Sequence, residues 1–539
     1  MRRYGFTVPT ARADRDAALA AQGGTELREG LSTVTRGTLF VIVTTLLLVL
    51  FNFVSRVLLT RTIGKDAWGS FSTVLALAAI LTSVGTLGLP NAVARSLPYE
   101  TSDDERRGIV RISLWVSVAA AASVAVALFG LSNELAPLLG GPRIALGLQF
   151  FSIAIAASIG STIVASIFQG YSDVTPNALF VQVINPGLFL AFLGVAFVLP
   201  QGRLSYVESL AAYAIANAVT LVALLAYAMR RLPRQLGPGP IAPGSGGRLL
   251  RFAFPLLVAG AMASLAGFGD TLVLGAYHHL QVATYTASLT LARLLQVGIN
   301  AAAYIYLPVA ARFRRRDNSQ AIRLTYTTVT KWMVLLSLPL FLLFVILPQR
   351  SLDFVYGPTY AAVLVPLQIA VSGAFLATLF GPGATTQVVY GRVRLLAYNS
   401  AAAGIADVGI AFALVPRFGA VGAAIAWGSA NVLYAGLCLI EVARHDAVHP
   451  FHRHFAAPLF ATLVPIGLLL AVFRASIPAW ALPPIGLAAA GAFVLAVVVS
   501  GSLDDGDRLL LGAVEGLLGR PVPFVRRLAR WSQRRRPNP

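Results

Sequence analysis

The sequence predicts an all-α polytopic membrane protein with about 14 transmembrane helices, and three observations support this prediction. Asp, Glu, Lys and Arg make up only 12% of the residues, about half their share in a typical soluble protein. Hydrophobic residues make up 57%, and the mean hydropathy is +0.74. Apolar runs of about 20 residues recur along almost the whole chain, each long enough to cross a hydrocarbon core of roughly 30 Å.

The apolar runs define fourteen predicted spans. Short segments rich in charge, glycine or proline separate them. The 36 residues before the first run carry no signal-peptide pattern, because acidic residues interrupt them. The first run is therefore expected to remain as a span. The predicted spans are residues 37–59, 70–94, 109–131, 144–168, 177–199, 206–229, 250–276, 284–308, 329–348, 361–384, 396–415, 419–441, 456–473 and 479–500.

The net charge of +20 follows the predicted topology and does not indicate a nucleic-acid partner. Lys and Arg number 33 in the N-terminal segment, the C-terminal tail and the loops after even-numbered spans, against seven in the opposite loops. Cytoplasmic loops of membrane proteins carry such an excess of positive charge. We therefore expect a multi-pass protein of the plasma membrane with both termini in the cytoplasm.

A linker divides the predicted spans into six and eight. Residues 230–248 are rich in Pro and Gly, so a flexible cytoplasmic connection is expected there. The basic tail fits either an interfacial helix or an unstructured segment. The predicted organisation is a cytoplasmic N-terminal segment at 1–36, an N-lobe at 37–229, the linker at 230–248, a C-lobe at 249–441, two further spans at 442–502 and a basic cytoplasmic tail at 503–539.

A weak internal repeat relates the two predicted lobes. A shift of 214 residue numbers lays residues 67–71 over residues 281–285, and each copy then reaches a Leu-Pro pair near the end of the next span. The same shift places Arg56 on Asp270. Repeats of this kind are typical of transporters whose halves are related by a pseudo-two-fold axis. The repeat therefore predicts two pseudo-symmetric lobes.

Three stretches carry a resemblance to a known family. Residues 56–71 read RVLLTRTIGKDAWGSF, and residues 85–95, after an apolar span, read GTLGLPNAVAR. Together they resemble the first two spans of the oligosaccharide and polysaccharide flippases in the multidrug/oligosaccharidyl-lipid/polysaccharide (MOP) exporter superfamily. Residues 414–426, LVPRFGAVGAAIA, resemble that family's loop between its eleventh and twelfth spans. With the span count, the resemblance covers nearly the whole chain.

The resemblance implies two six-helix lobes around a central cavity, with the last two helices added to the second lobe. It implies a transporter rather than an enzyme, one that moves a polyprenyl- or dolichyl-linked glycan from the cytoplasmic to the outer leaflet by alternating access. Membrane lipids are the other expected partners, and a monomer is expected to suffice. We predict no cofactor, and the sequence holds no Gly-rich phosphate loop of the kind that ATP hydrolysis uses.

Four charged residues lie inside the predicted spans, if charges within two residues of a span end are left out. A charge in hydrocarbon costs a few kcal/mol or more, so such residues usually face a partner or a water-filled cavity. They are therefore the first candidates for function. No catalytic residue and no metal site is predicted. The four residues are Arg56, Asp270, Arg293 and Asp407.

Arg293 and two amide side chains form the most specific local cluster of polar residues in the sequence. Arg293 lies nine residues into a predicted span, roughly 13 Å deep, and its fork of N–H donors suits the oxygens of a diphosphate. Gln296 and Asn300 follow at i+3 and i+7, so all three share one helix face. We predict that they bind substrate in the cavity; a structural ion pair is the alternative for Arg293.

The other three charges have two interpretations each. Arg56 is predicted to bind substrate in the cavity, or else to extend outward to the membrane surface. Asp270 is predicted to close an outer gate by pairing with Arg56 or Arg293, and a carboxylate satisfied by hydroxyl groups or water is the alternative. Asp407 stands where the resembled family often has Asn, so it is predicted to serve either a local structural role or ion coupling.

Other functions fit parts of the sequence. A multidrug or toxin exporter of the same superfamily would have twelve spans and a more acidic cavity, whereas a peptidoglycan-precursor flippase shares the span count. A membrane glycosyltransferase or polymerase would need acidic residues gathered in outer loops, and those loops hold only isolated acids such as Asp66, Glu134 and Asp353. A single cysteine, Cys438, excludes an internal disulfide framework.

Overall fold

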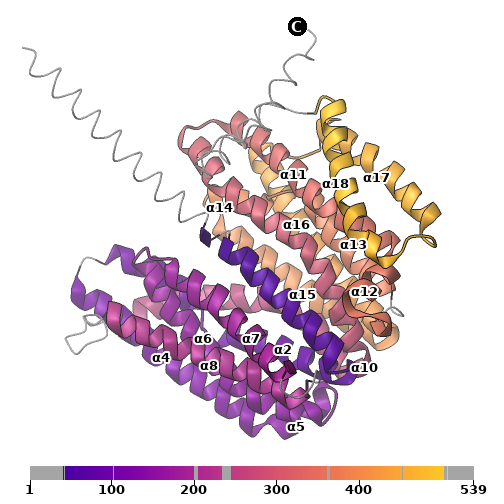
Figure 1. Ribbon diagram of the computed structural model, residues 1–539. Coiled ribbons are helices and arrows are strands. Elements are labelled where there is room, and N and C mark those ends of the chain that lie inside the picture. Colours follow the sequence, from indigo (N-terminus) through magenta and orange to yellow (C-terminus); the bar gives the residue numbers. More distant parts are fainter. Residues whose placement is uncertain are drawn as a thin grey trace, which may run out of the picture.

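The computed structural model describes residues 40–41, 43–100, 102–198, 204–232, 245–360, 364–451, 453–502 and 507 (Figure 1). Helices are the only regular elements in this part of the chain. The predicted N-terminal segment, most of the linker and nearly all of the basic tail lie outside the described residues. The prediction of an all-α polytopic membrane protein is confirmed.

The first described helix to cross the fold covers Val43–Thr62. Short 3-10 or π-helical segments lie at Leu97–Tyr99, Asn177–Ile184, Pro358–Tyr360 and Ala479–Ala481. The numbered helices are α2 Lys65–Gly85, α3 Leu89–Ser96, α4 Asp103–Gly130, α5 Ser132–Leu139, α6 Arg143–Gly170, α7 Asn185–Val198, α8 Tyr206–Arg231, α10 Ser245–Arg315, α11 Ser319–Ile346, α12 Pro348–Tyr356, α13 Val365–Leu379, α14 Gly383–Val389, α15 Val393–Phe418, α16 Ala420–Asp446, α17 Arg453–Phe473 and α18 Leu482–Val499.

Polar caps fix the starts of several long helices. The Ser102 hydroxyl accepts a hydrogen bond from the amide of Asp104 where α4 begins. Ser205 and Glu208 form a capping box at the start of α8, and the Asn318 side chain caps α11. These groups satisfy backbone donors that have no partner inside the helix.

In the described part of the chain, thirteen helices are long and apolar enough to cross a membrane. Helix α10 covers two predicted spans, 250–276 and 284–308. The backbone leaves helical geometry between them, at His278 (φ −143°, ψ 60°). A hydrogen bond from Arg293 to Gly267 shows that its two parts run side by side. Counted this way, the helices agree with the fourteen predicted spans.

Helix α11 starts almost three turns before the span predicted from its apolar run. Helix α11 begins at Ser319, ten residues before the predicted span at 329. Lys331, near the start of the predicted span, therefore lies more than three turns into α11, and it is only 3% exposed. The apolar run shows where the sequence becomes hydrophobic, but the Asn318 cap decides where the helix starts.

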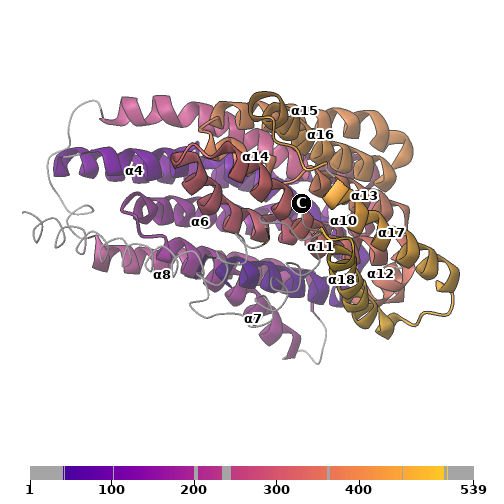
Figure 2. The same ribbon diagram turned by 90° about the horizontal axis from the view of Figure 1, so that it is seen from above.

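The helices form two groups that lie side by side (Figures 1 and 2). In the first half, α2, α4, α6, α7 and α8 pack on one another; in the second half, α10, α11, α13, α15 and α16 do so. Helix α10 also packs on α2 and so joins the halves. Helices α17 and α18 pack on each other and on α11. The exact domain bounds stay a prediction.

Residues related by the 214-residue shift meet where the two halves touch. The hydroxyl oxygens of Ser72 on α2 and Thr286 on α10 are 3.2 Å apart. A Cβ added to Gly69 would lie 3.7 Å from the Cβ of its counterpart, Ala283. In a two-fold arrangement a residue meets its own counterpart only at the axis. These contacts support a pseudo-two-fold axis that passes between α2 and α10.

Candidate functional site

Arg293 lies in the second part of α10 and contacts the first part. Its Nη2 donates a hydrogen bond of 2.5 Å to the backbone oxygen of Gly267. Its guanidinium carbon lies 4.8 Å from the centroid of the Phe268 ring, a cation–π contact. A guanidinium has five N–H donors, so these contacts leave donors that can face a substrate.

Arg56 and Arg293 meet at a small cavity between the two halves, with a volume of about 30 Å³. Arg56 Nη1 donates to Thr290 Oγ1 over 3.3 Å. Trp68 reaches the same cavity from α2, and its buried Nε1 has no hydrogen-bond partner within the described residues. Donors from both halves therefore converge here. The walls consist of Arg56, Trp68, Ser72, Leu75, Ala76, Phe268, Thr271, Thr286, Leu289 and Arg293.

The two predicted carboxylates are neighbours on different helices, and both are 0% exposed. Asp407 Oδ2 on α15 accepts a hydrogen bond of 3.2 Å from the backbone N–H of Asp270 on α10. The Asp270 carboxylate accepts from the amide (2.7 Å) and hydroxyl (3.2 Å) of Thr271 and from the hydroxyl of Tyr285. Asp407 Oδ1 is buried and has no partner among the described residues. It is an acceptor that the surrounding protein leaves unused.

The predicted gate pairs are not formed in this structure. Within the described residues, neither Arg56 nor Arg293 places a nitrogen within 4.0 Å of the Asp270 carboxylate. Two hydroxyls and one amide satisfy Asp270 instead, which is the alternative left open by the sequence. Hydrogen bonds to hydroxyls avoid the desolvation of a second charge that a buried ion pair requires.

A larger polar cavity of about 370 Å³ lies between α10, α15 and α16. Gln296 Nε2 donates to Asn431 Oδ1 over 2.9 Å, and Asn431 Nδ2 donates to the backbone oxygen of Trp427 over 2.8 Å. Hydrogen-bonding groups and aromatic rings are mixed here, as in many ligand sites. The walls consist of Ala263, Ala266, Gly267, Phe268, Arg293, Gln296, Ser400, Ala403, Trp427, Ala430, Asn431 and Tyr434.

The structure brings three of the four predicted cavity residues together. Arg293 lines both cavities, Gln296 lines the larger one and Arg56 the smaller one. Asn300 is exposed and belongs to neither wall. It shares the helix face of Arg293, but a step of seven residues moves it about 10.5 Å along the axis.

Sequence reasoning missed three residues of the site. Trp68 was visible only as part of the stretch that carries the family resemblance. Asn431 is one of several amides inside apolar runs, and nothing in its neighbourhood distinguishes it. Tyr285 is the shift counterpart of Phe71, so the added hydroxyl that binds Asp270 was the available signal.

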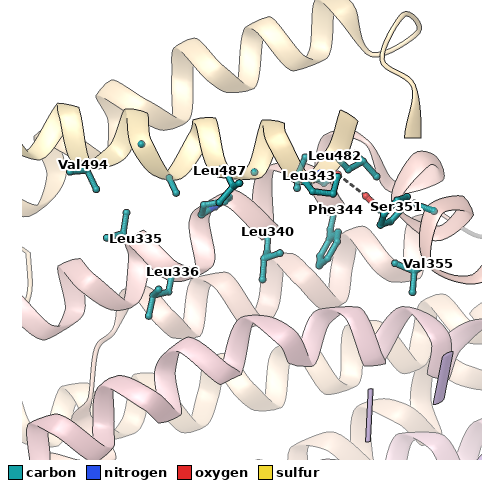
Figure 3. Close-up of a pocket in the computed structure, with 16 residues that line it drawn as sticks. Leu335, Leu336, Leu340, Leu343, Phe344, Ser351, Val355, Leu482, Leu487 and Val494 are labelled. Carbon is teal, nitrogen blue, oxygen red and sulfur yellow. Dashed lines mark hydrogen bonds between the residues drawn. The ribbon is translucent and has the colours of Figure 1, made fainter. Parts of the chain in front are cut away.

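An apolar groove of about 770 Å³ lies between α11, α12 and α18 (Figure 3). Leu335, Leu340 and Leu487 are among its lining side chains. Ser351 supplies the single hydroxyl of the wall, and this hydroxyl already donates to the carbonyls of Leu343 and Leu347. The groove shares no residue with the two polar cavities. It therefore suits hydrocarbon rather than a sugar or phosphate.

Solved structures with this fold are membrane transporters. The lipid II flippase MurJ in an inward closed conformation matches with a TM-score of 0.65 at 10% identity, over 86% of this chain and 98% of MurJ. An inward-facing multidrug resistance MATE family transporter of the MOP superfamily matches with a TM-score of 0.60 at 13% identity, over 74% of this chain and 94% of that one. A MOP superfamily transporter from Pyrococcus furiosus matches with a TM-score of 0.51 at 16% identity, over 77% and 95%.

The fold and the long apolar helices thus define a multi-pass membrane protein whose fold is shared with solved transporters of the MOP superfamily. At these low identities the structural likeness establishes the fold alone. None of the curated proteins compared with the chain is significantly similar to it in sequence. The family model described as polysaccharide biosynthesis protein matches residues 34–314. The chain belongs to this polysaccharide biosynthesis protein family.

Proposed function

We propose that this protein is a flippase that moves a polyprenyl-(di)phosphate-linked oligosaccharide from the cytoplasmic to the outer leaflet by alternating access. The translocated lipid then serves the assembly of a surface polysaccharide or of glycoprotein glycans. Membership of the polysaccharide biosynthesis protein family supports this role. The fold shared with a lipid II flippase supports a lipid-linked sugar as the substrate.

The convergence of donors between the two halves is the observation that carries the proposal. Arg56 and Trp68 come from the first half and Arg293 from the second, and all three reach one cavity. A diphosphate is a compact anion with many acceptor oxygens, and arginine binds such groups with paired hydrogen bonds. At about 30 Å³ this cavity holds little more than a water molecule. The halves must therefore separate before a diphosphate enters, as alternating access requires.

The remaining parts of the substrate fit the other two spaces. The amides and hydroxyls of the larger cavity can exchange hydrogen bonds with sugar hydroxyls, and Trp427 and Phe268 offer ring faces. Arg293 lines both polar cavities, so a glycan bound in one would be joined to a diphosphate bound in the other. The apolar groove of Figure 3 can hold only the hydrocarbon part of a lipid.

Asp270 and Asp407 are proposed to bind the coupling ion. Two ionised carboxylates side by side in a buried site repel each other, and neither has a cation within 4.0 Å in the described part of the chain. A proton or a small monovalent cation at the unpartnered Asp407 Oδ1 removes this repulsion. The site bridges α10 and α15, so its occupancy can bias how these helices pack. We also propose a plasma-membrane location, cytoplasmic termini and a functional monomer.

The proposed function is tested by deleting the gene and identifying the lipid-linked glycan that accumulates on the inner leaflet. Complementation then compares Arg293→Gln and Arg56→Gln with Asn300→Ala, an exposed position on the same helix as Arg293. Because each arginine supplies charge-assisted hydrogen bonds, its loss is expected to slow transport about tenfold or more. Asn300→Ala is expected to transport normally.

Two outcomes would refute the proposal. If no lipid-linked sugar accumulates in the deletion strain, the protein is not a flippase for such a substrate. If the arginine variants transport at the rate of the unmodified protein, the convergence of donors is not the binding site. Accumulation of the peptidoglycan precursor alone would assign the flippase to that lipid instead.

A further inference from the structure

A side chain of the first half caps the C-terminal end of a helix in the second half. Arg61 lies at the end of the helix Val43–Thr62, on the side that the charge pattern predicts to be extracellular. Its Nε donates to the backbone oxygen of Val355 and its Nη2 to that of Phe354, each over 2.8 Å. Both carbonyls belong to the last turn of α12.

The physical basis of this contact is the exposed end of α12. The last carbonyls of a helix have no partner inside it and carry a partial negative charge. The planar fork of an arginine satisfies two of them at once, and it stays charged at any cellular pH. Arg61 is therefore a C-terminal cap that comes from the other half of the molecule.

A second cation strengthens the same junction. The Lys65 ammonium lies 5.3 Å from the centroid of the Tyr360 ring, just after α12. Tyr356 in turn ties α12 to α10, because its hydroxyl donates to the backbone oxygen of Ala287 over 3.2 Å. The two cations of the first half thus bind a segment that is fixed to the substrate-site helix.

The contacts between counterpart residues of the two halves lie close to this junction along α2. Gly69 lies four residues after Lys65 on α2, and its backbone approaches the backbone of Ala283 on α10. Ser72 and Thr286 follow one turn deeper, and the cavity of the two arginines comes next, because both of these residues line it. The junction therefore closes the substrate cavity from the predicted outer side.

We propose that Arg61, assisted by Lys65, is the latch that holds the predicted outer gate closed, in place of the buried ion pair expected from the sequence. This inference rests on the proposed alternating-access function. Arg61 is exposed, so water replaces its two carbonyl partners when the gate opens. A buried ion pair would leave bare charges at that moment. An exposed helix cap is weak enough to be released in every transport cycle.

The test uses the full-length protein in membrane vesicles. A disulfide is introduced across the seam, which is the contact between α2 and α10 where Gly69 meets Ala283 and Ser72 meets Thr286. In Gly69→Cys/Ala283→Cys the Cβ spacing of 3.7 Å lies inside the range of about 3.5–4.5 Å seen in disulfides. The native Cys438 is 1% exposed and stays out of the reaction. Maleimide counts the free thiols after denaturation, and the measured quantity is the rate at which a mild oxidant lowers that count from three to one, the remaining thiol being Cys438.

Arg61→Gln in this background is expected to slow disulfide formation about fivefold, because two charge-assisted hydrogen bonds are lost. Arg61→Lys keeps the charge without the fork and is expected to slow it less. The matched control is Arg350→Gln, since Arg350 also lies on α12 but donates to Ala475 within the second half, over 3.5 Å. Arg350→Gln is expected to leave the rate unchanged.

An equal rate with and without the Arg61 guanidinium would overturn the latch. So would an equal slowing by Arg350→Gln, because the effect would then belong to α12 in general. Disulfide formation needs no substrate, so this result is independent of the glycan-accumulation experiment. A latch that passes the test while no lipid-linked sugar accumulates would refute the flippase and keep the gate.

Discussion

Single charged residues are held in this protein by partners that lie far away in the sequence. Lys331 on α11 forms an ion pair with Asp507, with 2.6 Å between Nζ and Oδ2, and it also donates to the backbone oxygen of Ser502 over 2.7 Å. Trp332 Nε1 donates to the other Asp507 oxygen over 2.8 Å. Both charged side chains are 3% exposed. The pair therefore anchors Asp507, which lies beyond α18 in the sequence, to α11 in the second half.

Lys331→Met and Asp507→Asn are each expected to lower stability by about 3 kcal/mol, because each breaks an ion pair between two side chains that are 3% exposed. The double variant is expected to lose much less than the sum, since either single change already breaks the same pair. Thermal unfolding of the purified protein in detergent measures all three. Additive losses in the double variant would show that the two side chains do not act as a pair.

The sequence identified the charges that lie inside the spans but not the groups that they contact. Arg56, Arg293, Asp270 and Asp407 were predictable as charges inside the spans because charge is rare in apolar runs; the two carboxylates are buried and the two arginines half-buried. Their partners were not predictable, because hydroxyls such as that of Tyr285 satisfy a carboxylate as well as an arginine does, and a hydropathy pattern does not register them. The anchoring role of Lys331 was hidden for another reason: its partner, Asp507, lies 176 residues away, in the predicted cytoplasmic tail.

At the scale of helices, hydropathy predicted the order and number of the spans, because each must cover the membrane with apolar residues. It could not predict that α10 would continue through two spans with a single departure at His278. Helix bounds depend on caps such as Asn318 rather than on the apolar run. Helix–helix distances were equally hidden, because they are set by individual small residues at the crossings.

The crossing of α13 and α16 tests whether a single small residue sets the distance between two helices. A Cβ on Gly373 would lie 2.5 Å from the Cα of Gly428, whereas a Cβ on Gly428 would meet nothing closer than 3.6 Å. Gly373→Ala is therefore expected to force the helices apart and to lower stability by about 1–3 kcal/mol. Gly428→Ala, the matched control at the same crossing, is expected to be tolerated. Equal melting temperatures for the two variants would contradict the crossing seen here.

At the scale of the whole molecule, the two halves touch where counterpart residues meet, and three features follow one another there, inward from the predicted outer side. The Arg61 junction comes first, the seam of counterpart residues follows, and the cavity of Arg56 and Arg293 lies beneath. The carboxylates of Asp270 and Asp407 lie to one side of these three features, inside the second half. Their position suits an ion that changes the second half without touching the gate directly.

Asp407→Asn provides the test of ion coupling, because the amide keeps the size of the side chain while removing its charge. In proteoliposomes that contain the lipid-linked glycan, the variant is expected to lose the acceleration of transport by an imposed proton or sodium gradient. Arg56 and Arg293 are unchanged, so substrate binding is expected to stay within about twofold of the unmodified protein. Asp317→Asn is the control, since that carboxylate is exposed and pairs with Arg314 at the surface. If Asp407→Asn responds to both gradients as the unmodified protein does, the carboxylate pair serves structure and the driving force enters elsewhere.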